Sequence, residues 1–309
     1  MKSILIFITT LCIVNTAHGQ GCSDAGLSST GSLKPSTNND SIKNSLGFTF
    51  NYSIGEHGTT IITPQFEPQI IISDKSMVQI KIPFNFIKGH LGNANGIGDV
   101  ILSYNYKIDS IWKYPIILTI GTRIASGTAS LKYNNFSLPM PYQTSLGTTD
   151  IILGAKMKFK KGFSISFGFQ NPLVNRNQNG FDSASYKILI TNKQINTKDN
   201  YSISSYLQRK GDIMFRLDKI LTFKKTQATL GLLPIYHLGN DLARINKATT
   251  IEMKNSRGLT LNFDAGLNYK IKNNIIFSAI AAAPIIFRIS RPDGLIRKMF
   301  TILGIQYFF

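Results

Sequence analysis

The sequence predicts an all-β protein, a transmembrane antiparallel up-and-down β-barrel, and three observations lead to this fold class. Long segments of the 309-residue chain alternate apolar and polar side chains with the period of two that strands require. After the first residues, no run of about 18 apolar residues occurs that could cross a bilayer as a helix. The alternation continues to the last residue, Phe309. A closed barrel is the remaining structure that pairs every backbone amide and carbonyl group in lipid.

The first nineteen residues have the pattern of a secretory signal peptide. Lys2 supplies a positive charge, residues 4–14 form a short apolar stretch, and Ala17 and Gly19 are the small residues that precede a cut before Gln20. The apolar stretch is too short to span a bilayer, which disfavours the alternative of an N-terminal membrane anchor. We therefore expect export from the cytoplasm and a cell outer-membrane location.

A single cysteine remains after this cut. Cys22 cannot form an intramolecular disulfide or a cysteine metal cluster in the mature chain. Its lipidation remains an alternative, although the expected Leu is missing before it. The surrounding residues 20–43 are rich in Ser, Gly, Asn and Thr, so we expect a flexible periplasmic segment or a plug inside the barrel lumen. Residues 44–309 form the barrel.

Strict alternation marks the individual strands. In the first, Leu46, Phe48 and Phe50 alternate with Gly47 and Thr49. Such segments are about ten to thirteen residues long, as tilted membrane strands are, and several carry aromatic residues near their ends. In a membrane barrel the apolar face meets lipid and the polar face meets the lumen. We predict fourteen strands: 44–54, 59–72, 76–87, 97–107, 113–125, 148–159, 162–171, 183–192, 200–208, 211–218, 223–236, 258–270, 274–287 and 297–309.

The spacing of these strands supports the count. With both termini in the periplasm, the connections on that side are short, and the longest connections, 126–147, 172–182 and 237–257, all fall outside. The strands 59–72 and 183–192 are the weakest, because prolines interrupt the first and the second is short. Twelve strands is the alternative.

A glycine–aspartate pair recurs where strands begin. Gly98-Asp99 precedes residues 100–104, Asp150 follows Gly147 before another strand, and Gly211-Asp212 is a fainter copy. This recurrence in a barrel of this size resembles the outer-membrane channels of the phenol meta-pathway degradation (MetA-type) family, which are distantly similar to long-chain fatty-acid transporter barrels. The resemblance implies uptake of small hydrophobic or aromatic compounds. It assigns no binding residue.

Both ends of the mature chain carry further resemblances. Residues 22–26 look like the start of mature barrel proteins from Bacteroidetes, although Ser28 stands where a second cysteine tends to follow. The alternation that runs into Phe309 is similar to the closing strand that the barrel-assembly machinery recognises.

For the aspartates of the recurring pair we favour a structural role over a role in substrate binding, because Asp accepts hydrogen bonds from turn amides.

The chain has 34 Lys and Arg against 16 Asp and Glu, a net charge of +18. In an exported barrel this surplus suits outer-membrane lipid and lipopolysaccharide rather than nucleic acid. We expect many of these cations, Arg209 and Arg291 among them, in solvated turns and loops.

Strand parity places other charges toward the lumen, since a Lys or Arg facing lipid at midplane costs about 2–4 kcal/mol. Their cationic surplus predicts a preference for anions in any open pore. The residues predicted to line the lumen are Lys81, Asp99, Lys107, Arg123, Asp150, Lys156, Lys158, Asp212, Arg216, Asp264 and Lys270.

No catalytic constellation stands out. The mature histidines are His57, His90 and His237, all expected near the extracellular rim, and His237 with Asp241 is the nearest approach to an acid–base pair. We predict no enzyme activity, no catalytic or metal-ligating residues and no cofactor. We expect a channel for passive or ligand-gated uptake of small solutes; a non-transporting structural or adhesion barrel and an outer-membrane hydrolase are the alternatives.

Overall fold

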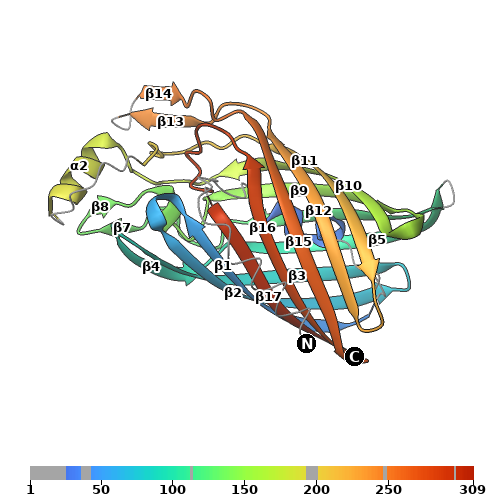
Figure 1. Ribbon diagram of the computed structural model, residues 1–309. Coiled ribbons are helices and arrows are strands. Elements are labelled where there is room, and N and C mark those ends of the chain that lie inside the picture. The colour runs from blue at the N-terminus through green and yellow to red at the C-terminus, as the bar shows by residue number, and fades with distance from the viewer. Residues whose placement is uncertain (1–25, 36–42, 112–113, 193–200, 246–248, 296) are drawn as a thin grey trace.

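The computed structural model describes residues 26–35, 43–111, 114–192, 201–245, 249–295 and 297–309, which form a closed antiparallel barrel (Figure 1). The sheet has thirteen strands in this described part. Two of these, which end and begin on either side of Gly98 and Asp99, both pair with the same neighbouring strand and count as one broken strand. Twelve strands therefore surround the lumen. The wall strands are β1 (Ser45–Gly55), β2 (Thr60–Ser73), β3 (Ser76–Gly89), β4 (Gly92–Ile97) with β5 (Val100–Ile111), β6 (Tyr114–Ile124), β9 (Thr148–Lys158), β10 (Phe163–Asn175), β11 (Asp212–Thr222), β12 (Thr226–His237), β15 (Gly258–Lys272), β16 (Ile275–Ile286) and β17 (Arg297–Phe308).

The barrel closes between its first and last strands. Phe48 of β1 lies opposite Ile305 of β17 on one side and opposite Phe66 of β2 on the other. Closure leaves the sheet without a free edge, so the backbone groups of the wall are paired within the wall.

The alternation has the orientation of a membrane barrel. Phe48 and Phe167 point outward and are each 50% exposed, whereas Thr260 and Asn262 of β15 point inward and are 0% exposed. An apolar outer surface around a polar interior is the reverse of a soluble sandwich. The predicted transmembrane antiparallel barrel is therefore confirmed, with the alternative count of twelve strands.

Two of the fourteen predicted strands are wrong. Residues 183–192 form the helix α2 (Ser183–Asn192), and residues 201–208 are irregular apart from an isolated bridge between Gln208 and Leu242. The β-branched residues of 183–192 favour a strand. The helix forms because Tyr186 and Leu189, three positions apart, are buried together. No helix in the described residues is long and apolar enough to cross a membrane.

The connections differ between the two ends of the barrel. Short turns lie at the end that holds Phe308, here called the turn end, and long loops with α2 lie at the opposite, loop end (Figure 1). The remaining short elements are η1 (Leu27–Ser29), η2 (Gly31–Leu33), η3 (Glu56–Gly58), β7 (Lys132–Tyr133), β8 (Phe136–Ser137), η4 (Met140–Tyr142), η5 (Lys160–Gly162), β13 (Leu242–Ile245) and β14 (Thr249–Glu252).

Candidate functional site

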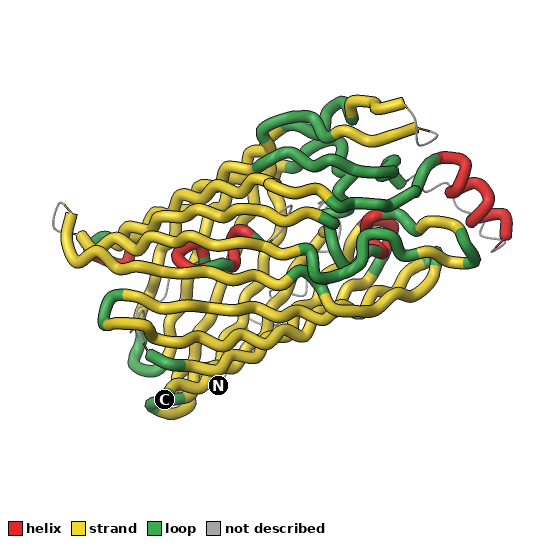
Figure 2. The backbone as a smooth tube through the Cα atoms, turned by 180° about the vertical axis from the view of Figure 1, so that it is seen from behind, coloured by secondary structure: helices red, strands yellow, loops and turns green. Residues whose placement is uncertain are grey.

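Residues 26–35, here called the luminal segment, lie inside the barrel; short helical turns are visible behind the front strands in Figure 2. Lysines from the wall hold the segment by its backbone. The Lys81 ammonium group on β3 donates to the carbonyl of Ser29, and Lys156 Nζ on β9 donates to the carbonyl of Lys34 at 2.6 Å. Lys34 in turn forms an ion pair with Glu67 on β2 at 2.9 Å. The segment therefore spans the lumen between separate strands.

Leu33 anchors the same segment by apolar packing. Its side chain is 0% exposed and lies over Gly154 and Gly168 of neighbouring strands. A Cβ atom added at either glycine would come within about 3 Å of Leu33, at 2.9 Å and 3.0 Å. The two glycines therefore provide the space that the Leu33 side chain fills.

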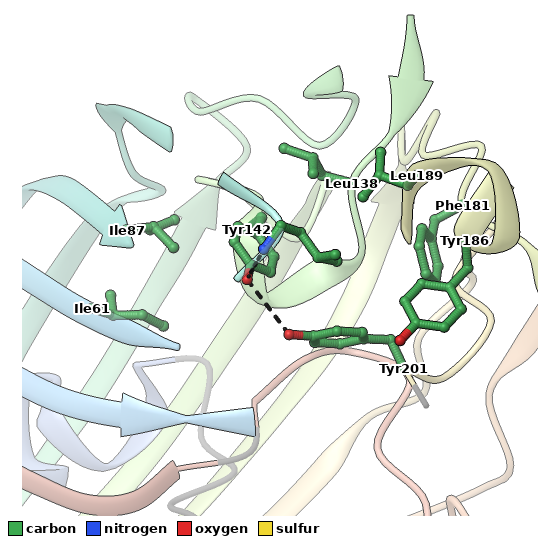
Figure 3. Packing of buried hydrophobic residues seen from close by; sticks show 9 residues of the cluster. Ile61, Ile87, Leu138, Tyr142, Phe181, Tyr186, Leu189 and Tyr201 are labelled. Atoms are coloured by element: carbon green, nitrogen blue, oxygen red, sulfur yellow. Dashed lines mark hydrogen bonds between the residues drawn. The ribbon is translucent and has the colours of Figure 1, made fainter. Parts of the chain in front are cut away.

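At the loop end, residues of the loops form a compact apolar cluster, here called the loop cap (Figure 3). Tyr142 and Phe181 are both 0% exposed, and Tyr201 lies within 6.4 Å of each ring. The Tyr142 hydroxyl accepts a hydrogen bond from the amide of Leu91 at 3.1 Å. The loop cap comprises Leu138, Tyr142, Phe181, Tyr186, Leu189 and Tyr201, and it packs on Ile61 and Ile87 of the wall and on Leu91.

A chamber of about 240 Å³ lies between the luminal segment and the loops. Gly26, Ser28 and Ser29 line it from the segment, and residues 140–141, 143–146 and 293–295 line it from the loops. One side of its wall is apolar and the other carries charges. The apolar residues include Ile61, Ile87, Ile280, Phe300 and Ile302, and the charged ones are Asp99, Arg123, Arg216, Asp264 and Asp293.

Two aspartates of the recurring glycine–aspartate pair share one arginine beside the chamber. Arg123 Nη2 binds Asp150 Oδ2 at 2.6 Å and Thr148 Oγ1 at 2.7 Å, whereas its Nη1 is 3.6 Å from Asp99 Oδ2. Asp150 also accepts from Gln170 at 2.5 Å. The motif aspartates therefore point into the barrel and brace adjacent strands with charge-assisted hydrogen bonds.

A second buried ion network joins the wall to the loop over residues 287–295. Arg209 contacts both Asp212 and Asp293, at 3.2 Å to the latter, and Arg288 contacts Asp293 at 3.1 Å. Burial alone would raise the pKa of Asp293, but the charges of Arg288 and Arg209 hold it well below its ordinary value. Burial alone would lower the pKa of Arg209, and Asp212 and Asp293 raise it instead. Asp293 and Arg209 are thus both held charged.

His237 connects this network to the loop that follows β12. Its Nδ1 lies 2.7 Å from Asp212 Oδ1 and its Nε2 lies 2.9 Å from Asp241 Oδ1. The nearby Ser256 hydroxyl donates to the carbonyl of Met253 and accepts from the amide of Asp241. Both ring nitrogens are engaged by carboxylates, so His237 is not arranged as the base of a serine nucleophile.

Gly294 brings the 287–295 loop against the η4 loop. Its φ is +68°, and an added Cβ would lie 2.6 Å from the amide nitrogen of Pro141 and 2.7 Å from the carbonyl carbon of Met140. Both contacts are with backbone, which cannot move aside as a flexible side chain can. Only glycine fits this position without separating the two loops.

Replacing Gly294 by alanine is expected to loosen this part of the chamber. The left-handed conformation costs about 1–2 kcal/mol, and the backbone overlap adds to it. Cleavage by trypsin after Arg288, which is 3% exposed, should accelerate by about tenfold or more, since proteolysis follows the population of the open form. Gly58→Ala is the control, with φ +74° and no atom within 4 Å of its added Cβ. Equal cleavage in both variants would contradict the loop contact.

The predicted lumen residues divide into two groups. Eight lie inside the barrel and are buried or nearly so: Lys81, Asp99, Arg123, Asp150, Lys156, Asp212, Arg216 and Asp264. The other three lie toward the turn end. Lys270 is exposed, Lys158 is half-buried, and the side chain of Lys107 is 42% exposed and lies 3.8 Å from Asp109.

Several buried charges were not expected from the sequence. Arg209 and Arg291, predicted as solvated loop cations, are 5% and 1% exposed, so the prediction is wrong for both. Arg209 is buried because it is paired with two aspartates, and Arg291 packs over the ring of Phe287. The close spacing of Arg288, Arg291 and Asp293 was the available signal for a paired loop.

Solved structures of other outer-membrane barrels are similar to this chain, and two of them are compared with it. An outer-membrane channel from Pseudomonas putida F1 matches 89% of this chain and 100% of its own, with a TM-score of 0.58 and 13% identity. The NanC porin matches 85% and 100%, with a TM-score of 0.50 and 9% identity. Identities this low show a shared barrel fold. A scan against models of protein families gives no match, and a search of curated proteins gives no significant match.

Proposed function

We propose that this protein is an outer-membrane channel that takes up small solutes by passive or ligand-gated diffusion. The observation that carries the proposal is the chamber inside a closed membrane barrel, which is lined in part by structures that do not belong to the wall. Bacterial barrels have short turns on the periplasmic side and long loops outside, so the loop end is extracellular and the turn end periplasmic. The lumen is thereby divided into an outer mouth, the chamber and an inner exit.

Both boundaries can move without breaking the barrel. The luminal segment pairs with no wall strand and is held by side chains such as Lys81, Lys156 and Leu33. The loop cap packs on the ends of β2 and β3 through Ile61 and Ile87. We infer that the segment serves as a plug and the cap as an outer gate, with the sheet hydrogen bonds intact in every state.

The size and lining of the chamber support small solutes with an apolar part. An engineered apolar cavity of about 150 Å³ accepts benzene, and this chamber measures about 240 Å³. Small hydrophobic or aromatic compounds, the class implied by the resemblance to the MetA-type family, are therefore the proposed substrates. The same proposal includes membership in that family, a signal peptide at residues 1–19 and a plug within residues 20–43.

The predicted preference for anions would have to arise outside the chamber. The charged residues that line the chamber are three aspartates and two arginines, so the cationic surplus of the chain is not found there. A reversal potential in a salt gradient measures this preference directly.

Liposome swelling combined with planar-bilayer recording tests the proposed function. The refolded full chain should admit uncharged solutes near the size of the chamber and exclude larger ones, with small discrete conductance steps. Protein-free liposomes are the control. A folded barrel that passes neither ions nor solutes would contradict the channel and favour the structural or adhesion barrel.

A further inference from the structure

The polar groups around the chamber differ in how fully their hydrogen bonds are satisfied. Asp264 binds Arg216 with both carboxylate oxygens. Asp293 forms ion pairs with Arg209 and Arg288 and accepts a hydrogen bond from the amide of Leu295. The amide of Asn85 accepts from Thr63 and donates to the carbonyl of Thr144. These groups have little capacity left for a ligand.

Asp99 is different, because its charge is only partly compensated. One oxygen, Oδ2, accepts from the amide of Leu146 at 3.3 Å and lies 3.6 Å from Arg123, and the side chain of Ser145 also donates to this carboxylate. The short bonds of Arg123 go to Asp150 and Thr148 instead. The other oxygen of Asp99, Oδ1, has no hydrogen-bond partner, although the side chain is only 8% exposed. A buried carboxylate oxygen without a donor is unfavourable, and a ligand that supplies one gains that free energy.

Two acceptors in the network next to Asp99 also lack hydrogen-bond partners. Asp150 Oδ1 and Gln170 Oε1, both on residues that are 0% exposed, also have no partner. Arg123 lies 2.6 Å from Asp150 and 3.6 Å from Asp99, so these two carboxylates share its guanidinium group. Two carboxylates against one guanidinium group leave a net negative charge beside this part of the chamber.

Asn51 presents a second available acceptor from another wall strand. Its side chain lines the chamber from β1, and its Oδ1 is buried without a hydrogen-bond partner. Beside it the lining is apolar, with Ile61 on β2 and Ile302 on β17. A ligand that fits would place an apolar body against these isoleucines and direct hydrogen-bond donors toward Asn51 and Asp99.

We propose that the chamber is a binding site for small molecules with an apolar body and a donor-bearing polar end, a protonated amine above all and a hydroxyl next, and that Asp99 excludes carboxylates from it. This inference rests on the proposed uptake of small solutes and names the class that the chamber selects. An ammonium group would form a charge-assisted hydrogen bond to Asp99 Oδ1. A carboxylate would bring a like charge to the same oxygen, which disfavours binding.

Three probes of one shape test the proposal: cyclohexylmethylamine, cyclohexylmethanol and cyclohexanecarboxylate. Their binding to the full chain in phosphatidylcholine nanodiscs is measured by calorimetry at neutral pH, with empty nanodiscs subtracted. We expect the amine to bind most tightly, with about ten- to a hundredfold higher affinity than the carboxylate, the range of a charge-assisted hydrogen bond. Asp99→Asn should bring this ratio close to one.

Matched variants separate selectivity from folding. Asp109→Asn changes an exposed aspartate that pairs with Lys75 near the turn end, and it should leave the ratio unchanged. Asn51→Leu should weaken the amine and the alcohol alike, so that the site can be tested even if Asp99→Asn fails to fold. Folding is checked by the shift of the unheated barrel on an SDS gel.

The outcomes distinguish this site from the proposed function. Equal affinities, a preference for the carboxylate, no binding of any probe, or an amine preference that persists in folded Asp99→Asn would each overturn the proposed site. Amine-selective binding by a barrel that passes no solute in liposomes would instead refute the channel and leave the site in place. Solute flux without selective binding would support the channel and overturn the proposed site.

Discussion

Replacing Arg209 by methionine is expected to destabilise the protein by about 3–5 kcal/mol, because the change removes a buried cation that two buried aspartates share. Arg209 contacts Asp212 on β11 and Asp293 in the loop over the chamber, and all three residues are buried. Methionine keeps the length of the side chain and removes its charge. Urea unfolding of the barrel in lipid vesicles measures the loss, and trypsin cleavage after Arg288 should report the release of the loop.

Two comparison variants test the reason for this loss. Arg257→Met removes an exposed arginine that stacks on Tyr236, and it should change the stability by no more than about 1 kcal/mol. Adding Asp212→Asn to Arg209→Met should recover part of the stability, since it removes the carboxylate that has lost its arginine, whereas Asp293 keeps its ion pair with Arg288. If Arg209→Met is as stable as Arg257→Met, the network does not hold the loop in place.

Replacing Leu33 by arginine is expected to displace the luminal segment and to raise the single-channel conductance severalfold. Leu33 fills the space over Gly154 and Gly168 beside Met214, and none of these residues can pair with a guanidinium group. Lys156, which binds the adjacent carbonyl of Lys34, would repel it. Burying an unpaired charge costs several kcal/mol, and about 5.5 kcal/mol shifts a two-state equilibrium from 1:99 to 99:1.

Leu33→Met is the matched control for this prediction, because it keeps the volume and the apolar character of the side chain. It should leave the conductance close to that of the native chain. Since residues 26–35 belong to no wall strand, both variants should still fold as barrels. An arginine variant that folds and conducts like the native protein would show that the segment does not limit passage.

Twelve of the fourteen predicted strands could be identified because lipid imposes a strict pattern on them. A wall strand must present apolar groups on one face over its whole length, so residues such as Phe48 and Phe50 stand out in the sequence. The segments 183–192 and 200–208 lie in the loops, where this constraint is absent. There the packing of Tyr186, Leu189 and Tyr201 around Phe181 decided the structure.

The candidate site was predictable to a smaller extent. Parity along the strands indicated that Asp99, Arg123 and Asp150 face the same side of the wall. Parity could not show that Asp99 and Asp150 share Arg123 from a neighbouring strand, or that Oδ1 of Asp99 has no hydrogen-bond partner. Those facts depend on the register between strands and on the loops packed above them.

The sequence by itself determined that this protein is an all-β barrel with an apolar outer surface and inward-facing charges, since the period of two and the chemistry of lipid act on each strand locally. Only the tertiary structure decided that residues 26–35 enter the lumen, that Arg209 is buried with Asp293, and that a chamber of about 240 Å³ remains between segment and loops. Contacts between residues far apart in the chain create these features, and no local pattern encodes such contacts.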